Sequence, residues 1–91
     1  MRELLESTAQ RAITYLEGLD TRAVAPDAAA VTNLAVLDEP LPQSSTPEAD
    51  VLRQLDELCS PATMAMAGPR FFGSIIGGAL PVTLAAHWLA G

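Results

Sequence analysis

The clearest helix signal in the chain lies in TPEADVLRQLDELCSP, residues 46–61. The Thr46 side chain can cap a helix, Pro47 suits the first helical position, and the carboxylates that follow favour the positive end of the helix dipole. Apolar residues then recur at three- and four-residue spacing until a second proline ends the pattern. The stretch therefore predicts an amphipathic helix over residues 47–59.

Three further helices are predicted from the same kind of pattern. Residues 3–18 repeat apolar side chains with helical spacing, and Gly18 is a suitable stop. Asp27 can cap a helix over residues 27–37, and Pro81 suits the first turn of a mostly apolar helix over residues 81–90. A loop is expected at residues 68–80, which contain four glycines. The predicted fold class is mostly α, with three to four helices and a Gly/Pro-rich loop.

Composition limits the classes of function that the chain can serve. A chain of 91 residues forms one small domain at most. Its five basic residues are all arginines, against eleven carboxylates, so the net charge is −6 and we expect no nucleic-acid partner. Cys59 has no second cysteine to pair with, and the first residues lack a secretory pattern. The expected localisation is cytoplasmic.

The charge is distributed unevenly along the chain. All eleven carboxylates lie at or before Glu57, whereas residues 71–90 have no acidic, lysine or arginine side chain. Such an apolar segment predicts either a membrane span or a surface that more protein covers. Pro81 interrupts the segment and no cationic residue follows it, so we do not expect a membrane span. Because an apolar helix stops with the chain, we expect the natural chain to continue.

Three features of this apolar region are open to a functional and a structural interpretation. The glycine run at residues 73–78 could cradle a phosphate, but it lacks the spacing of known nucleotide loops, so a tight turn is favoured. Arg70 could bind a carboxylate or phosphate, although pairing with an acid elsewhere in a larger assembly is favoured. His87 has no second histidine beside it, so we expect no metal site and a packed or rim position.

The run GPRFFGSIIGGALP, residues 68–81, followed by LAAHWLA at residues 84–90, resembles the early segment of group II pyridoxal-phosphate-dependent amino-acid decarboxylases. Shorter similarities, RAITYL at 11–16, RAVAP at 22–26 and LP at 41–42, follow in the family's order. The resemblance implies that residues 1–91 are the N-terminal helical arm of a fold-type I carboxy-lyase whose large cofactor-binding domain is absent. The implied partners are the remainder of that fold, a second subunit of the homodimer and an amino-acid substrate.

The resemblance also implies where the chemistry lies. The family holds pyridoxal phosphate on a lysine, and this chain has none, so it would bind no cofactor covalently and be inactive alone, with no catalytic residue of its own. Five residues are implied at the rim of the substrate and cofactor pocket: Phe72, Ser74, Ile75, Gly77 and Gly78. Ser74 stands where the family usually has an aromatic residue. The alternative is a small helical interaction or membrane-associated protein that uses the apolar residues 71–90.

Overall fold

The chain begins with its longest helix, α1 (Arg2–Gly18), in the region where the sequence predicts one. The computed structural model describes residues 1–73, 78 and 80–91. Gly18 is the last helical residue, and Leu19 after it keeps right-handed helical angles, with φ −61° and ψ −33°. The stop at Gly18 therefore needs no left-handed glycine.

The second helical segment consists of α2 (Ala28–Asn33) and a 3₁₀ turn, η1 (Leu34–Leu37). Asp27 caps α2, because its Oδ1 accepts a hydrogen bond of 2.7 Å from the backbone N–H of Ala30. The Thr32 hydroxyl donates back to the carbonyl of Ala28 at 2.9 Å. The two elements together occupy residues that the sequence assigns to one helix, and the expected cap at Asp27 is confirmed.

The third segment consists of α3 (Glu48–Gln54), a π-helical turn η2 (Leu55–Cys59) and a 3₁₀ turn η3 (Ser60–Ala62). The prediction that Thr46 caps this helix is wrong. Pro47 occupies the cap position with φ −54° and ψ 136°, and its carbonyl accepts the N–H groups of Asp50 and Val51. The helix starts one residue later than expected, which leaves Thr46 outside the first turn.

The end of this segment also differs from the prediction. Pro61 was expected to stop the helix at Cys59, but the turn continues to Ala62 in 3₁₀ form. A proline is tolerated there because the first residues of a helical turn need no backbone N–H donor. Thr63 closes the turn, donating from its hydroxyl and its backbone N–H to the carbonyl of Ser60.

The last helix is α4 (Pro81–Ala90), with Pro81 in its first turn as the sequence predicts. The Thr83 hydroxyl accepts a hydrogen bond from the N–H of Leu80 and donates to the carbonyl of the same residue. The mostly α fold class is confirmed, since residues 1–73, 78 and 80–91 contain four α-helices and no strand. None of the helices in those ranges has the length and apolar character needed to cross a membrane.

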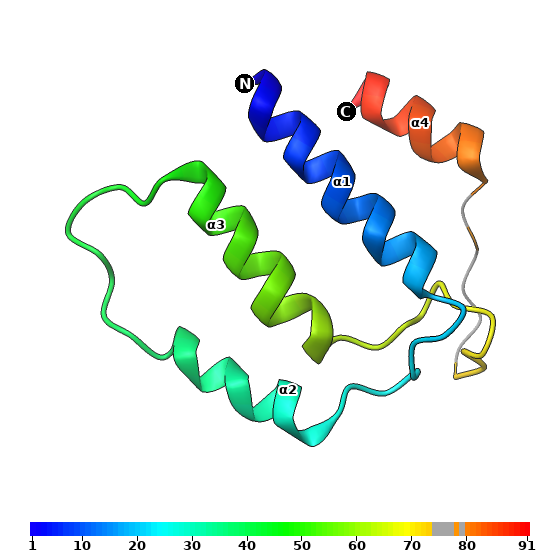
Figure 1. Cartoon of the computed structure of the whole chain (residues 1–91), viewed down its shortest axis with the longest axis horizontal. Helices are drawn as coiled ribbons and strands as arrows, with labels where there is room; N and C mark the ends of the chain where they lie inside the picture. The colour runs from blue at the N-terminus through cyan, green and yellow to red at the C-terminus, as the bar shows by residue number, and fades with distance from the viewer. Residues whose placement is uncertain (74–77, 79) are drawn as a thin grey trace.

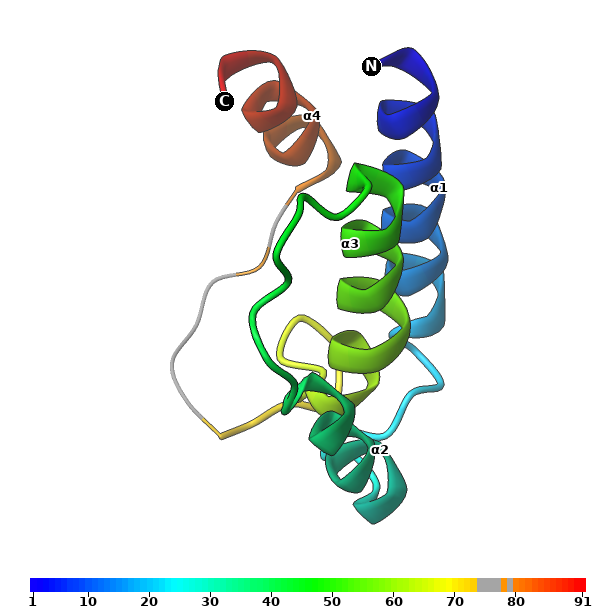
Figure 2. The same cartoon turned by 90° about the vertical axis from the view of Figure 1, so that its left-hand side faces the viewer.

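The helices are arranged as a pair with two flanking elements. In Figure 1, α1 and α3 run side by side in the same direction, and the view in Figure 2 agrees. α2 lies against the end of α3 that η2 and η3 form. Figure 2 shows the α4 ribbon set apart from the α1–α3 pair.

This arrangement buries little of the chain. Leu19 and Ala65 are the buried apolar residues among those described. The accessible surface is 7446 Å², about 2400 Å² more than the roughly 5000 Å² that a compact monomer of 9.5 kDa exposes. The radius of gyration is 15.2 Å, against about 12 Å for a compact domain of this length. The helices are formed, but most of their apolar faces have no cover.

Candidate functional site: an apolar groove

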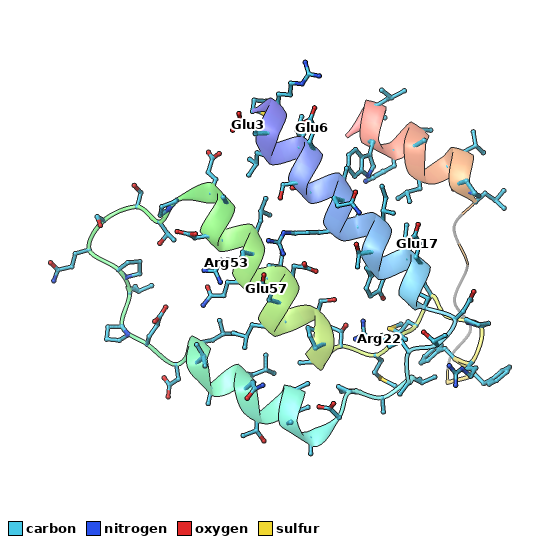
Figure 3. The ribbon with its side chains drawn as sticks, viewed as in Figure 1. Glu3, Glu6, Glu17, Arg22, Arg53 and Glu57 are labelled. Atoms are coloured by element: carbon cyan, nitrogen blue, oxygen red, sulfur yellow. The ribbon has the colours of Figure 1, made fainter. Side chains whose placement is uncertain are left out.

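Two arginines hold the junction between the end of α1 and the chain that follows η3. The Nη2 of Arg22 donates to the carbonyls of Ser60 and Thr63, at 2.6 and 2.8 Å. The same guanidinium lies over the ring of Tyr15, 5.4 Å from its centroid, and Figure 3 marks its place at the turn after α1. The charge of Arg22 is therefore used to join segments about forty residues apart in the sequence.

Arg70 supports the same junction, and its expected pairing with an acid in a larger assembly stays a prediction. Its Nη2 donates to the carbonyl of Asp20 at 2.9 Å, with a longer contact of 3.5 Å to that of Arg22. A Cβ on Gly68 would lie 3.2 Å from the carbonyl oxygen of Ala65 and 3.3 Å from that of Leu19. The Gly-Pro-Arg stretch thus has a structural role here, with Gly68 permitting close approach and Arg70 binding the turn.

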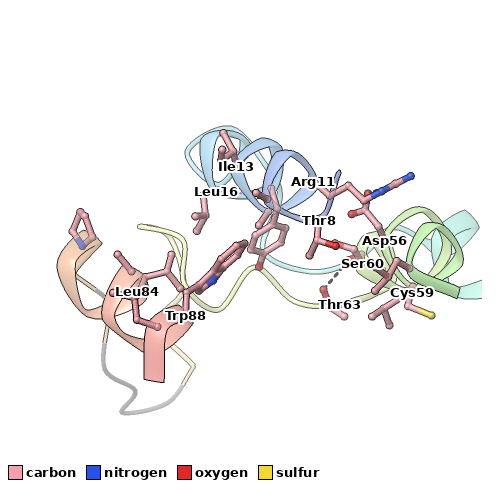
Figure 4. Close-up of a pocket in the computed structure, with 18 of the residues that line it drawn as sticks. Thr8, Arg11, Ile13, Leu16, Asp56, Cys59, Ser60, Thr63, Leu84 and Trp88 are labelled. Carbon is pink, nitrogen blue, oxygen red and sulfur yellow. Dashed lines mark hydrogen bonds and ion pairs between the residues drawn. The ribbon is translucent and has the colours of Figure 1, made fainter. Parts of the chain in front are cut away.

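Next to this junction, α1, α3, η2 and α4 border an open apolar groove of about 1210 Å³. One face of α1, one face of α3 and η2, and one face of α4 line it, as Figure 4 shows for most of the residues. The lining residues are Thr8, Ala9, Arg11, Ala12, Ile13, Tyr15, Leu16, Leu52, Leu55, Asp56, Cys59, Ser60, Thr63, Leu80, Pro81, Leu84, Ala85, Trp88 and Leu89. Its volume exceeds the usual range of about 300–1,000 Å³ for small-molecule pockets.

The apolar side chains of the groove are largely uncovered. Leu16 of α1 is 44% exposed, Leu55 of η2 is 59% exposed and Trp88 of α4 is 50% exposed. In Figure 4, Leu84 and Trp88 lie across the groove from Ile13 and Leu16 of α1. Uncovered apolar surface of this extent is typical of a surface that a partner or a ligand covers.

The arginine that lines the groove pairs with neighbouring carboxylates. Arg11 of α1 donates from Nη1 to Oδ2 of Asp56 at 2.7 Å, and Glu57 lies 3.6 Å from the same nitrogen. The hydrogen bond with Asp56 raises the pKa of Arg11, so the guanidinium stays charged and neutralised by its neighbours. Arg11 is thus a link between α1 and η2 rather than an open anion site.

The groove offers little chemistry beyond binding. Cys59 lines it, but within residues 1–73, 78 and 80–91 no cluster of histidine, cysteine and carboxylate side chains could hold a metal ion. The single histidine, His87, is exposed on α4 and does not line the groove. The arrangement therefore suits the binding of an apolar surface.

The implied pocket-rim residues do not lie in this groove where the structure describes them. Phe72 is 90% exposed, and a Cβ on Gly78 would meet nothing within 4 Å. The other three, Ser74, Ile75 and Gly77, lie outside the described residues. The described residues do not fit pyridoxal phosphate, because the chain has no lysine and the groove's one arginine is neutralised by two carboxylates.

The groove itself was not predicted from the sequence, although its helices were. Periodicity identifies an apolar face on each helix but not which faces meet, and the only signal was the uncovered apolar segment at residues 71–90. No family model matches the chain, and neither a curated protein nor a solved structure matches it. The groove and the junction below it are therefore the basis for assigning a function.

Proposed function

We propose that the chain is the N-terminal helical arm of a pyridoxal-phosphate-dependent L-amino-acid decarboxylase and acts by packing onto the rest of that enzyme. In this role it contributes contacts to the large domain and to the second subunit of a cytoplasmic homodimer, and part of the rim of the substrate pocket. It does no chemistry alone, because it has no lysine to hold the cofactor. The family itself comes from the resemblance of residues 68–90.

The observation that carries the packing role is the excess of accessible surface, to which large exposed apolar side chains such as Leu55 and Trp88 contribute. The additional area of about 2400 Å² is within the range that one partner contributes to a large obligate interface, which totals about 2,000–5,000 Å² or more. The apolar groove, lined by three helices, is one part of this uncovered surface. A segment that packs against more protein exposes apolar faces when it is alone, whereas an independent domain covers its own apolar faces.

The contacts of single residues in the Gly-Pro-Arg stretch, residues 68–70, are consistent with this packing role. Gly68 lies close to two backbone carbonyls, and Arg70 binds the carbonyl of Asp20. These contacts fix where the chain turns after α1 and η3, before it leads to α4. The start of the motif that carries the family resemblance thus holds the turn after α1 against the chain that follows η3.

A second candidate function is a small helical interaction protein unconnected with a decarboxylase. The observation that favours it is the groove, whose lining is made by described residues of this one chain. Its partner would then be another protein, and no cofactor would be involved. The experiment below separates the two candidates.

The test is to mix the 91-residue chain with a group II decarboxylase from which the corresponding N-terminal segment has been removed. We expect a stable complex in sedimentation and recovery of carbon dioxide release from the amino-acid substrate. Neither component alone would show this activity. Failure to form the complex, or a complex without recovered activity, would contradict the proposal.

A matched pair of variants locates the contact. Leu84→Glu places a charge in the groove, where it would lie unpaired beneath the partner and weaken assembly at least about tenfold. Leu41→Glu places the same charge on a loop residue that is 92% exposed and outside the groove, so assembly is expected to be unchanged. Equal behaviour of the two variants would show that the groove is not the contact.

A further inference from the structure

We infer that the groove binds an amphipathic helix that is apolar on one face and carries lysine or arginine along the edge of that face. This rests on the part of the proposed function that assigns the groove to protein contacts, and it names the chemistry of the segment that covers it. It does not depend on whether that segment belongs to a decarboxylase.

The dimensions of the groove favour a helix. Its α4 wall runs from Leu80 to Leu89, which at 1.5 Å per residue is about 15 Å, or roughly three helical turns. The walls are helix faces bearing leucine, isoleucine and tryptophan, which accept the apolar stripe of another helix. An added β-strand needs a sheet edge, and the described part of the chain has none.

Two exposed carboxylates, Glu17 and Glu48, lie at helical spacing from residues that line the groove. Glu17 follows Ile13 by four residues on α1, and Glu48 precedes Leu52 by four on α3, so each lies beside a lining residue on its helix. Both carboxylates are exposed, and neither forms an ion pair within residues 1–73, 78 and 80–91. Figure 3 shows Glu17 near the end of α1, on the side toward α4.

No lining cation offsets this acidity. Arg11 is the one lysine or arginine in the lining, and it is engaged by Asp56 and Glu57. A second copy of this chain has no lysine, and its five arginines are already engaged by carboxylates or backbone carbonyls in the structure, so it offers Glu17 and Glu48 no unengaged cation. A helix with a basic edge instead gains from both the apolar walls and these two carboxylates.

The experiment uses two designed peptides of about twelve residues, sufficient for three helical turns. Both have the same leucine stripe, one with lysines along its edges and the other with glutamates, and neither contains tryptophan. Trp88 is the only tryptophan of the chain and lines the groove, so its emission reports binding there. We expect the lysine peptide to shift the emission of Trp88 to shorter wavelength at a concentration where the 91-residue chain sediments as a monomer.

Single neutralisations test these carboxylates, with the helix content of each variant compared by circular dichroism because Glu48 also lies in the first turn of α3. Glu17→Gln and Glu48→Gln are each expected to weaken binding of the lysine peptide by about two- to fivefold. Glu39→Gln makes the same change of net charge on an exposed residue that follows η1, outside the groove, and is expected to leave binding unchanged.

Three results would overturn the inference. The first is equal binding of the glutamate peptide. The second is a loss of affinity in Glu39→Gln equal to that in Glu17→Gln and Glu48→Gln, because the loss would then follow from the net charge of the chain alone. The third is an emission from Trp88 that neither peptide changes. Because no decarboxylase is present, failure here leaves the reconstitution experiment of the proposed function intact, and success here does not guarantee that reconstitution.

Discussion

At the scale of single residues, the junction below the groove depends on how closely backbone segments can approach. Gly68 lies against the carbonyls of Leu19 and Ala65, and the N–H of Ala65 donates to the carbonyl of Val24 at 2.9 Å. Ala65 is also the most buried of the described residues, at 1% exposure. The few contacts that fix the turn after α1 are thus concentrated around one glycine.

Gly68→Ala is expected to destabilise this junction by about 1–2 kcal/mol, because the neighbours of the added methyl group are backbone carbonyls that cannot rotate away. The measurement is hydrogen exchange of the Ala65 amide, whose protection is expected to fall by roughly five- to thirtyfold. Gly18→Ala is the matched control, since a Cβ there meets nothing within 4 Å and alanine favours the helix by about 0.5–1 kcal/mol. Equal effects of the two substitutions would show that close approach at Gly68 has no energetic role.

At the scale of elements, the sequence predicted the helical regions well and their caps unevenly. Apolar spacing places each helix because it reports the face that must be buried, whatever covers that face. The cap at Asp27 was predicted from the residue type alone, and its carboxylate does accept from the N–H of Ala30. The prediction of a cap at Thr46 was wrong because Pro47, which lacks an N–H, occupies the cap position itself. A shift of one residue in the start of a helix changes which residue caps it, and apolar periodicity does not locate a helix boundary to within one residue.

These two caps lead to a comparative prediction. Asp27→Ala removes the hydrogen bond to the Ala30 amide and is expected to cost about 1 kcal/mol in the stability of α2. Thr46→Ala is expected to change the stability of α3 very little, because no side chain caps that helix. Hydrogen exchange of the first-turn amides of each helix measures both effects. A loss of protection in α3 on Thr46→Ala, comparable to that in α2 on Asp27→Ala, would contradict the assigned cap positions.

At the scale of the whole molecule, the sequence indicated an uncovered apolar region but not the groove. Residues 71–90 stood out because they contain no acidic, lysine or arginine side chain. The rest of the groove comes from α1 and η2, whose apolar faces look, in the sequence, like those of any surface helix. Bringing these faces together depends on contacts between distant segments, such as Arg22 with Thr63, which spacing along the chain does not reveal.

The small number of buried apolar residues predicts how the isolated chain behaves in solution. With Leu19 and Ala65 as the buried apolar residues of the described part, we expect a loose helical ensemble that self-associates as its concentration rises. Circular dichroism at two concentrations is the measurement, and broad thermal transitions that shift with concentration are the expected result. A sharp transition of a monomer, independent of concentration, would show that the helices pack better than this surface indicates.

The two kinds of link in the molecule also respond differently to salt. Arg22 and Arg70 donate to backbone carbonyls, which carry no net charge, whereas Arg11 joins α1 to η2 through carboxylates. Dissolved ions screen the attraction between opposite charges, so we expect high salt to weaken the Arg11 link while the hydrogen bonds to carbonyls persist. The contact between α1 and η2 is then the first to loosen, and the turn after α1 stays joined to the chain beyond η3.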